Sequence, residues 1–232
     1  MFIMIIHFIY KNFFQINEIH KKQKNHRFMS QLVELKPVCR EDVKRISNWL
    51  RDSEVSEAWF GRYTYGNPAH LGYEPEIMIT ASQAEWNEVF NDPHHEPHRD
   101  IFSIYKIIGD KHIGEGQLSI DEALGDAQIS VLLGDKNEWY KGYGTASSLA
   151  MLEHIFINLK LYRAWVDIPE YNITAKTMFE NLGFIHEGTL RKSRPHGGAR
   201  HNSYILGMLF DEFKEKFPHG IDNHVVEWKK NI

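Results

Sequence analysis

Two glycines lie close together at the expected start of a helix, beside a lysine and a tyrosine. The stretch at 138–147 reads EWYKGYGTAS and contains Gly142 and Gly144. Glycines at such a place let backbone amides approach another group closely, because they carry no Cβ atom. A helix N-terminus also presents unpaired N–H groups and the positive end of the helix dipole, which together bind phosphate. The spacing therefore indicates a site for a phosphorylated ligand.

Several interpretations of these glycines compete. The Walker pattern is absent because no Gly-Lys-Ser/Thr follows, and the dinucleotide fingerprint G-x-G-x-x-G fails at Ser147. That fingerprint also requires its first glycine directly at a strand end, whereas the preceding strand is expected to stop near Leu133 or Gly134. A tight turn without a ligand remains open. So does a nest of amides from Lys141 to Thr145 that holds a diphosphate.

The hydrophobic pattern around this stretch predicts a mixed α/β or α+β sheet with helices on its faces. Apolar alternation and turn residues predict strands over 32–38, 101–109, 111–121, 127–134, 162–168, 184–193 and 202–210. Helical spacing predicts helices over 40–52, 80–92, 145–160 and 172–183, the last beginning after Asn172 and stopping at Gly183. Residues 53–80 and 194–201 are rich in glycine, proline or polar residues and are expected to be loops.

Composition limits the class of protein. The 232 residues are 42% hydrophobic and 25% charged, which suits one domain with extensions. The single cysteine, Cys39, excludes an internal disulfide framework and indicates a reducing, cytoplasmic location. The net charge of −4 argues against nucleic acid as the main partner and is compatible with a cationic substrate such as an amine.

The N-terminus does not match the rest of the chain. The run MFIMIIHFIY is shorter than a membrane helix and lacks the flanking features of a secretory signal. A natural domain start follows at Met29. We therefore expect residues 1–28 to be an appendage outside the fold, disordered or translated from an upstream start codon, with a weak membrane-surface anchor as the alternative. We expect one domain over 29–214 and a C-terminal extension over 215–232.

Two motifs together resemble those of a known family. The stretch WYKGYGTA at 139–146 is similar to Q/R-x-x-G-x-G/A, and NITAKTMFENLGF at 172–184 is similar to N-x-x-A/S-x-x-x-Y/F-E-x-x-G-F. In this order they resemble the GNAT N-acetyltransferase superfamily, over roughly 32–211. The tail HEGTLRKS…NSYILGML resembles the RimJ/RimL-like branch. The resemblance implies a mostly antiparallel twisted sheet of six to seven strands with about four flanking helices, and acetyl-CoA as co-substrate.

The resemblance also implies a set of cofactor-binding residues. Main-chain groups of Val131, Leu132 and Leu133 would pair with the pantetheine arm like an added strand. Amides of Lys141, Gly142, Tyr143, Gly144 and Thr145 would hold the pyrophosphate, and the Thr145 hydroxyl would be an extra donor. Trp139 stands where the first motif usually has Gln or Arg, and Asn172 would lie near the thioester.

The implied reaction is direct attack of a neutral amine on the acetyl-CoA thioester, but the residues depart from the common catalytic pattern. The family's frequent glutamate base corresponds to Gln128, which cannot accept a proton usefully near neutral pH, and its frequent tyrosine acid corresponds to Phe179. Substitute bases are Glu115, Asp126 and Glu187, and substitute acids are Tyr143 and Tyr204. Because of these departures, a non-catalytic acyl-CoA-binding module on the same fold stays open.

The acceptor and the partners are less determined. Glu54, Glu57, Glu74 and Glu76 favour a cationic acceptor, which the resemblance makes a protein N-terminal amine, a polyamine or an aminoglycoside-like small molecule. His94, His95 and His98 lie in a proline-rich loop without helical spacing, so we expect no metal. We expect no nucleic-acid partner and no firm membrane association. An exposed final strand would allow a homodimer.

Overall fold

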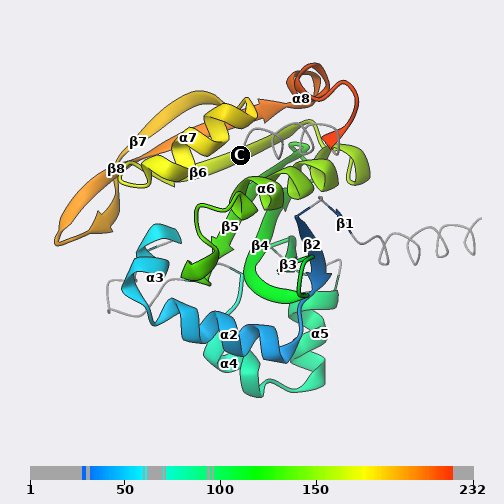
Figure 1. The fold of residues 1–232 in the computed structure, drawn as a ribbon, viewed down its shortest axis with the longest axis vertical. Helices are drawn as coiled ribbons and strands as arrows, with labels where there is room; N and C mark the ends of the chain where they lie inside the picture. The colour runs from blue at the N-terminus through cyan, green and yellow to red at the C-terminus, as the bar shows by residue number, and fades with distance from the viewer. Residues whose placement is uncertain are drawn as a thin grey trace, which may run out of the picture.

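One eight-stranded sheet organises the residues that the computed structural model describes, which are 28–29, 32–59, 61, 70, 72–92, 95 and 97–221 (Figure 1). Its order is β1-β2-β3-β4-β5-β6-β8-β7. The strands are β1 (Phe28–Met29), β2 (Val33–Pro37), β3 (Arg99–Lys106), β4 (Lys111–Asp121), β5 (Asp126–Leu133), β6 (Arg163–Pro169), β7 (Ile185–His196) and β8 (Ala199–Leu209). All neighbours are antiparallel except β5 and β6. The predicted fold class, a mixed and mostly antiparallel sheet with flanking helices, is confirmed. The sheet has eight strands instead of the expected six to seven.

Helices cover both faces of this sheet. They are α2 (Arg40–Leu50), α3 (Ser53–Trp59), α4 (Pro75–Thr80), α5 (Gln83–Asn91), α6 (Tyr143–Glu153), α7 (Ile173–Leu182) and α8 (Phe210–Lys216), with the short helices η1 (Lys136–Glu138) and η2 (His154–Asn158). The short helices α3, α4 and α8 add to the four expected. The caps follow from residue type. The Ser82 side chain accepts a hydrogen bond from the Glu85 amide at the start of α5. Gly183 ends α7 with a φ of 104°, which only glycine adopts freely.

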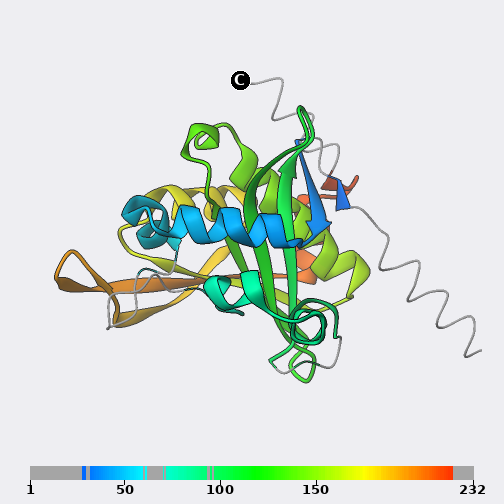
Figure 2. The same ribbon diagram turned by 90° about the horizontal axis from the view of Figure 1, so that it is seen from below.

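Two predicted loops were wrong in part. Residues 53–80 contain α3 and α4, which have only seven and six residues and so show too few turns for a periodic signal. In the second case, β7 continues to His196 and β8 begins at Ala199, so the predicted loop over 194–201 shrinks to a turn at Gly197 and Gly198. Much of this hairpin is exposed, so its strands carry little apolar alternation. It extends beyond the rest of the sheet (Figures 1 and 2).

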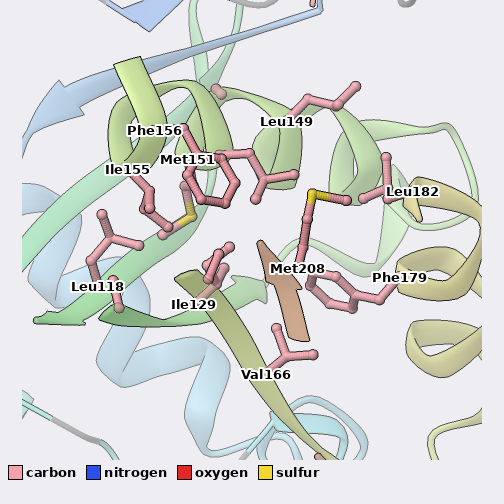
Figure 3. Close-up of a cluster of buried hydrophobic side chains, with 14 of the residues drawn as sticks. Leu118, Ile129, Leu149, Met151, Ile155, Phe156, Val166, Phe179, Leu182 and Met208 are labelled. Carbon is pink, nitrogen blue, oxygen red and sulfur yellow. The ribbon is translucent and has the colours of Figure 1, made fainter. Parts of the chain in front are cut away.

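The main core lies between the sheet and the pair α6 and α7. Figure 3 shows side chains from these helices, such as Met151 and Phe179, on the same side of the sheet as the sheet residues Ile129, Val166 and Met208. Helix α6 is buried continuously from Ala146 to Leu152, which fixes its position against the strands. Two smaller clusters join α2, α3, α4 and α5 to the opposite face, where Figure 2 shows α2 across the strands.

Some expectations concern residues outside the described part. Residues 1–27 and 222–232 lie outside it, as does His94. Phe28 and Met29 form β1 and pair with Leu35 and Glu34. The expected boundaries at 28/29 and 214/215 stay predictions. In the described part of the chain, no helix is both long and apolar enough to cross a membrane.

A buried carboxylate fastens α2 to the sheet. Asp42, 1% exposed, accepts hydrogen bonds from the Ser103 and Tyr105 hydroxyls of β3, each at 2.7 Å, and from Arg45 Nη2 at 2.5 Å. Burial alone raises the pKa of Asp42, but the bonds from Tyr105 and Ser103 and the nearby His112 outweigh it and lower that pKa to about 2. The ionised form is therefore the one that the fold stabilises.

This carboxylate predicts a loss of stability in acid. The pKa of Asp42 in the folded chain, about 2, is below its ordinary value of 3.8, so its contribution is complete above about pH 5 and disappears as the pH falls through about 2. The contribution is roughly 2 kcal/mol in the free energy of unfolding. Urea unfolding from pH 7 to pH 2 measures it, with Asp42→Asn as the comparison. An equal decline in the Asp42→Asn variant would contradict the assignment.

A second prediction concerns Gly114 on β4. A Cβ atom there would lie 2.0 Å from the Leu132 carbonyl oxygen of β5, and backbone cannot move aside as a side chain can. Gly114→Ala should cost roughly 1–3 kcal/mol, or about 2–4 °C in Tm for each kcal/mol. Gly188→Ala is the matched control, since a Cβ atom at that strand glycine meets nothing within 4 Å. Equal melting temperatures for the two variants would refute the close contact.

Candidate active site

The candidate site is a cavity where two parallel strands separate. β5 and β6 pair at only three places, Asp126 with Arg163, Ala127 with Ala164 and Gln128 with Trp165. Beyond them a cavity of about 460 Å³ opens, lined by residues 129–133 on one side and 166–169 on the other. This edge of β5 has no strand partner in the described chain past Gln128. Alternate residues of a strand point to the same edge, so the N–H and C=O of Val131 and the N–H of Leu133 are available to an extended ligand. The Leu132 carbonyl points instead to Gly114 of β4, so the expected pairing through Leu132 is wrong.

Three helices complete the walls. Helix α3 contributes Val55, Ala58 and Trp59, and α7 contributes Thr174, Ala175, Met178 and Phe179, with Asn172 just before it. The start of α6 contributes Gly142, Gly144 and Thr145, and the loop before it contributes Trp139 and Tyr140. The lining is mostly apolar and ends at a helix N-terminus, which suits a ligand with an uncharged arm and an anionic group.

The start of α6 presents unpaired amides. Gly142 is the N-cap with a φ of 83° and no side chain to cap the helix, and its carbonyl accepts the Ala146 amide at 3.0 Å. The amides of Tyr143, Gly144 and Thr145 meet no hydrogen-bond acceptor among the described residues. No acidic side chain stands in the first turn. This end of the helix can therefore take an anion.

Gly144 is not required by an unusual backbone conformation or by a steric clash. A Cβ atom there would meet Met178 Sδ at 3.4 Å and Leu133 Cδ1 at 3.7 Å, which are ordinary contacts. Trp139 Nε1 donates to the Leu133 carbonyl at 2.7 Å and holds the glycine loop to the end of β5. The two parts of the predicted cofactor site are thus tied together by one side chain.

The structure brings most of the predicted cofactor residues to this cavity. Its lining includes Val131, Leu132, Leu133, Trp139, Gly142, Gly144, Thr145 and Asn172. The Lys141 ammonium instead lies 3.3 Å from Glu138, and Tyr143 packs against the main core. Their amides still belong to the loop and the first turn of α6. Their roles in binding a cofactor stay predictions.

Asn172 has two structural partners. Its Oδ1 accepts the Ala175 amide at 3.1 Å and caps α7, and its Nδ2 donates to the Ala58 carbonyl at 2.8 Å. It therefore links the start of α7 to α3, two walls of the cavity. The sequence predicted the cap but not the bond to Ala58, which joins residues 114 positions apart.

Most of the predicted catalytic groups lie away from the lining. Asp126 accepts Arg163 Nη1 at 3.0 Å at the start of β5, and Glu187 of β7 bonds the same guanidinium. Gln128 lies at the last β5–β6 pair and is half-buried. Tyr204 packs against the core, whereas Phe179 lines the cavity.

Glu115 lies in a buried polar cluster on the face that α2 to α5 cover. It is 1% exposed and accepts Gln117 Nε2 at 2.7 Å and the Tyr73 hydroxyl, while His70 Nε2 lies at 2.9 Å. Burial, and next the Glu115 charge, raises the pKa of Tyr73 well above its ordinary value. The His70 ring contacts that of Trp59, with centroids 4.9 Å apart, so the cluster lies behind one wall of the cavity.

Sequence reasoning missed Asp167, which lines the cavity from β6. Its Oδ2 accepts Arg194 Nη2 of β7 at 2.5 Å. The signal was available in the strand pattern. Ala164, Val166 and Ile168 alternate into the core, so an acidic residue between the last two must face away from it, at the carboxyl end of a parallel strand.

The predicted acidic acceptor residues do not form one cluster. Glu57 of α3 lies 2.7 Å from His196 Nδ1 of β7, whereas Glu54 pairs with Lys136 and Glu76 with Arg51. Glu74 is the N-cap residue of α4. Among the residues that the structure describes, no group of histidine, cysteine and acidic side chains could hold a metal ion.

Comparisons with known proteins agree with this architecture. Residues 33–185 match the family described as "Acetyltransferase (GNAT) domain". An aminoglycoside N(6')-acetyltransferase type 1 of Klebsiella pneumoniae is 25% identical over 169 residues, covering 72% of this chain and 80% of that protein. A spermidine N-acetyltransferase of Vibrio cholerae, solved with CoA and spermine, has a TM-score of 0.62 at 19% identity, covering 78% of this chain and 97% of that one. An acetyltransferase of the GNAT family from Bacillus anthracis has a TM-score of 0.62 at 17% identity, covering 80% and 99%.

Asn172 gives a prediction that separates its two bonds. Asn172→Ala should lower stability by about 0.5–2 kcal/mol, because α7 loses its cap. Asn172→Ser keeps a capping hydroxyl, but its side chain is too short to reach the Ala58 carbonyl, so its Tm should stay closer to that of the native chain than the Tm of Asn172→Ala. Both variants should increase amide hydrogen exchange in α3. Protection of α3 that is unchanged in both would show that the Ala58 bond does not hold this wall.

Proposed function

This chain belongs to the acetyltransferase (GNAT) domain family and is an N-acetyltransferase, and we propose that acetyl-CoA and a primary amine react in its cavity within one ternary complex. The acceptor amine is that of a protein N-terminus, a polyamine or an aminoglycoside-like small molecule. Proteins of similar sequence or fold are described as acting on the last two classes. The observation that carries the proposal is the cavity that runs from the unpaired edge of β5 to the uncapped start of α6.

The residues of this cavity fit acetyl-CoA in two ways. A pantetheine arm has amide donors and acceptors along an extended chain, which would pair with the N–H and C=O of Val131 and the N–H of Leu133. The Leu133 carbonyl already accepts Trp139 Nε1. The amides of residues 143–145 meet no acceptor among the described residues and can donate to a pyrophosphate. Such a helix start binds a pyrophosphate without a particular cation. We propose that Gly142 and Gly144 approach this pyrophosphate.

The reaction requires a neutral amine. A lysine-type amine has a pKa of about 10.4 and is almost fully protonated at neutral pH, so one proton must leave before attack. The amine nitrogen then bonds to the thioester carbonyl carbon, and the C–S bond breaks. The CoA sulfur takes a proton, and the amine's second proton is lost from the tetrahedral intermediate. Backbone N–H groups on β5 are the candidate donors to the oxyanion.

The path of the proton is a separate proposal. Asp126 and Gln128 lie outside the cavity lining, at the paired part of β5, and Glu115 lies behind Trp59. Of these three predicted groups, Glu115 has a contact route to the cavity, through the His70 and Trp59 rings. We therefore propose that Glu115 affects proton transfer at the site through His70 and does not contact the acceptor.

We also propose the RimJ/RimL-like branch and a cytoplasmic location. The branch is supported by Trp139 in the first motif and by the tail HEGTLRKS at 186–193. A Vibrio cholerae structure assigned as a ribosomal-protein-serine acetyltransferase shares the fold with a TM-score of 0.57 at 14% identity, covering 80% of this chain and 98% of that one. The location is supported by the single cysteine.

The proposal is tested first by titration calorimetry of the full chain with acetyl-CoA, with ATP and NAD as controls. We expect micromolar acetyl-CoA binding and much weaker binding of both controls. An amine panel then measures transfer by the release of free CoA thiol. Equal binding of ATP would assign the glycine loop to a nucleotide phosphate instead.

Gly144 provides the sharpest variant. Gly144→Val should weaken acetyl-CoA binding at least about tenfold, because its methyl groups extend over the amides at the start of α6. Gly144→Ala adds a single methyl group at ordinary contact distances and should keep or raise the Tm, since alanine favours helix. Native affinity in a folded Gly144→Val variant would overturn the pyrophosphate assignment.

A further inference from the structure

Asp167 is the carboxylate that the structure places at the wall of the cavity. Its neighbours on β6, Val166 and Ile168, point into the main core, so its side chain lies on the opposite face of the strand. The carboxylates predicted as bases are absent from the lining. The Asp167 side chain is 14% exposed. This largely enclosed carboxylate forms an ion pair with Arg194.

Arg194 and Asp167 form only one of the two hydrogen bonds that an arginine–aspartate pair can form. Arg194 Nη2 donates to Asp167 Oδ2 at 2.5 Å. Asp167 Oδ1 and Arg194 Nε are both buried and have no hydrogen-bond partner in the described part of the chain. An arginine–aspartate pair usually forms two parallel bonds that would satisfy both atoms. One unused acceptor and one unused donor thus stand within the same ion pair.

A carboxylate, Glu57, and a phenol, Tyr171, lie near Arg194. Tyr171 lies in the turn between β6 and α7 and stacks on the His196 ring, with centroids 4.1 Å apart. His196 in turn contacts Glu57 of α3, the helix that also lines the cavity. Burial raises the pKa of Tyr171, an effect opposed by Arg194 and aided by Glu57, so these charges lie near the phenol. Of these charged groups, Asp167 lines the cavity, and Glu57 and Arg194 lie behind its wall.

We infer that Asp167 and Arg194 together form the acceptor subsite, an inference that rests on the function proposed above. The acceptor's ammonium group donates to Asp167 Oδ1, and Arg194 Nε donates to an oxygen that neighbours the amine. Both unused atoms are buried and Arg194 lies outside the cavity lining, so the inference requires the two side chains to rotate when the acceptor binds. The acceptor class is therefore an amine with an adjacent hydroxyl, ether or carbonyl oxygen. Peptide N-termini and aminoglycosides have such an oxygen.

Polyamines do not satisfy this pair. A protonated polyamine carries donors only, so it leaves Arg194 Nε buried without an acceptor. A site built around a hydrogen bond discriminates strongly against a ligand that lacks the partner, because the unpaired group costs free energy. The chemistry of one ion pair thus selects among the acceptors that the family relationship leaves open.

The test measures acceptor binding directly, by calorimetry of the full chain in the presence of CoA. The probes are kanamycin, a short peptide with a free N-terminal serine, and spermidine. We expect at least one of the first two to bind about tenfold or more tightly than spermidine. The two oxygen-bearing probes distinguish a small molecule from a protein N-terminus. Tightest binding of spermidine would overturn the inference.

Three variants assign the effect to the two side chains. Asp167→Asn should weaken the preferred acceptor about ten- to hundredfold, with Asp167→Glu restoring part of the affinity. Arg194→Lys keeps the positive charge but removes Nε, so it should reduce the preference over spermidine and leave spermidine binding unchanged. Asp126→Asn is the matched control, because Asp126 also pairs with an arginine on the neighbouring strand but lies outside the cavity lining.

The same titrations separate this inference from the proposed function. The acetyl-CoA affinity of each variant should equal that of the native chain. If the native chain binds no acetyl-CoA, the proposed function fails, while acceptor binding still reports on Asp167. If acetyl-CoA binds normally but Asp167→Asn leaves acceptor affinity unchanged, or Asp126→Asn weakens it equally, the acceptor subsite is refuted.

Discussion

The separation of β5 from β6 after Gln128 is the constraint on which the rest of the structure depends. Two neighbouring strands normally satisfy each other's backbone groups along their whole length. Here three residue pairs join the strands, and the main chain beyond them faces a cavity. Such an opening in the middle of a sheet is unfavourable unless a ligand or water satisfies the backbone, which is the physical reason to seek function there.

Packing on both faces keeps the opening in place. On one face, the buried helix α6 spans the strands, and its fixed position puts its amide end beside the last residues of β5. On the other face, Trp49 of α2 fills the space above Gly134, where any Cβ atom would lie 2.1 Å from its ring. Asn172 and Trp139 then tie the walls to each other by single hydrogen bonds. The site is therefore held by the core rather than by its own loops.

The acidic residues of this chain illustrate how one residue type serves different purposes. Asp42 is buried and bonded to hydroxyl groups of β3, so it fastens a helix. Asp126 and Glu187 share Arg163 and fasten the strands where β5 and β6 still pair. Glu115 joins a buried network with His70 and Tyr73. Asp167 alone among these five lines the cavity, and its ion pair is only half formed.

The sequence by itself determined the mixed sheet, most of its strands and the glycine loop before α6, because these depend on local periodicity and on glycine's missing Cβ atom. It also predicted the cap at Asn172, which acts over three residues. It did not predict α3 and α4, whose short lengths leave no periodic signal, nor the Asn172–Ala58 bond. Which carboxylate reaches the cavity was decided by tertiary structure. The alternation on β6 indicates that Asp167 faces away from the core, but only the point at which β5 and β6 diverge places it at a cavity.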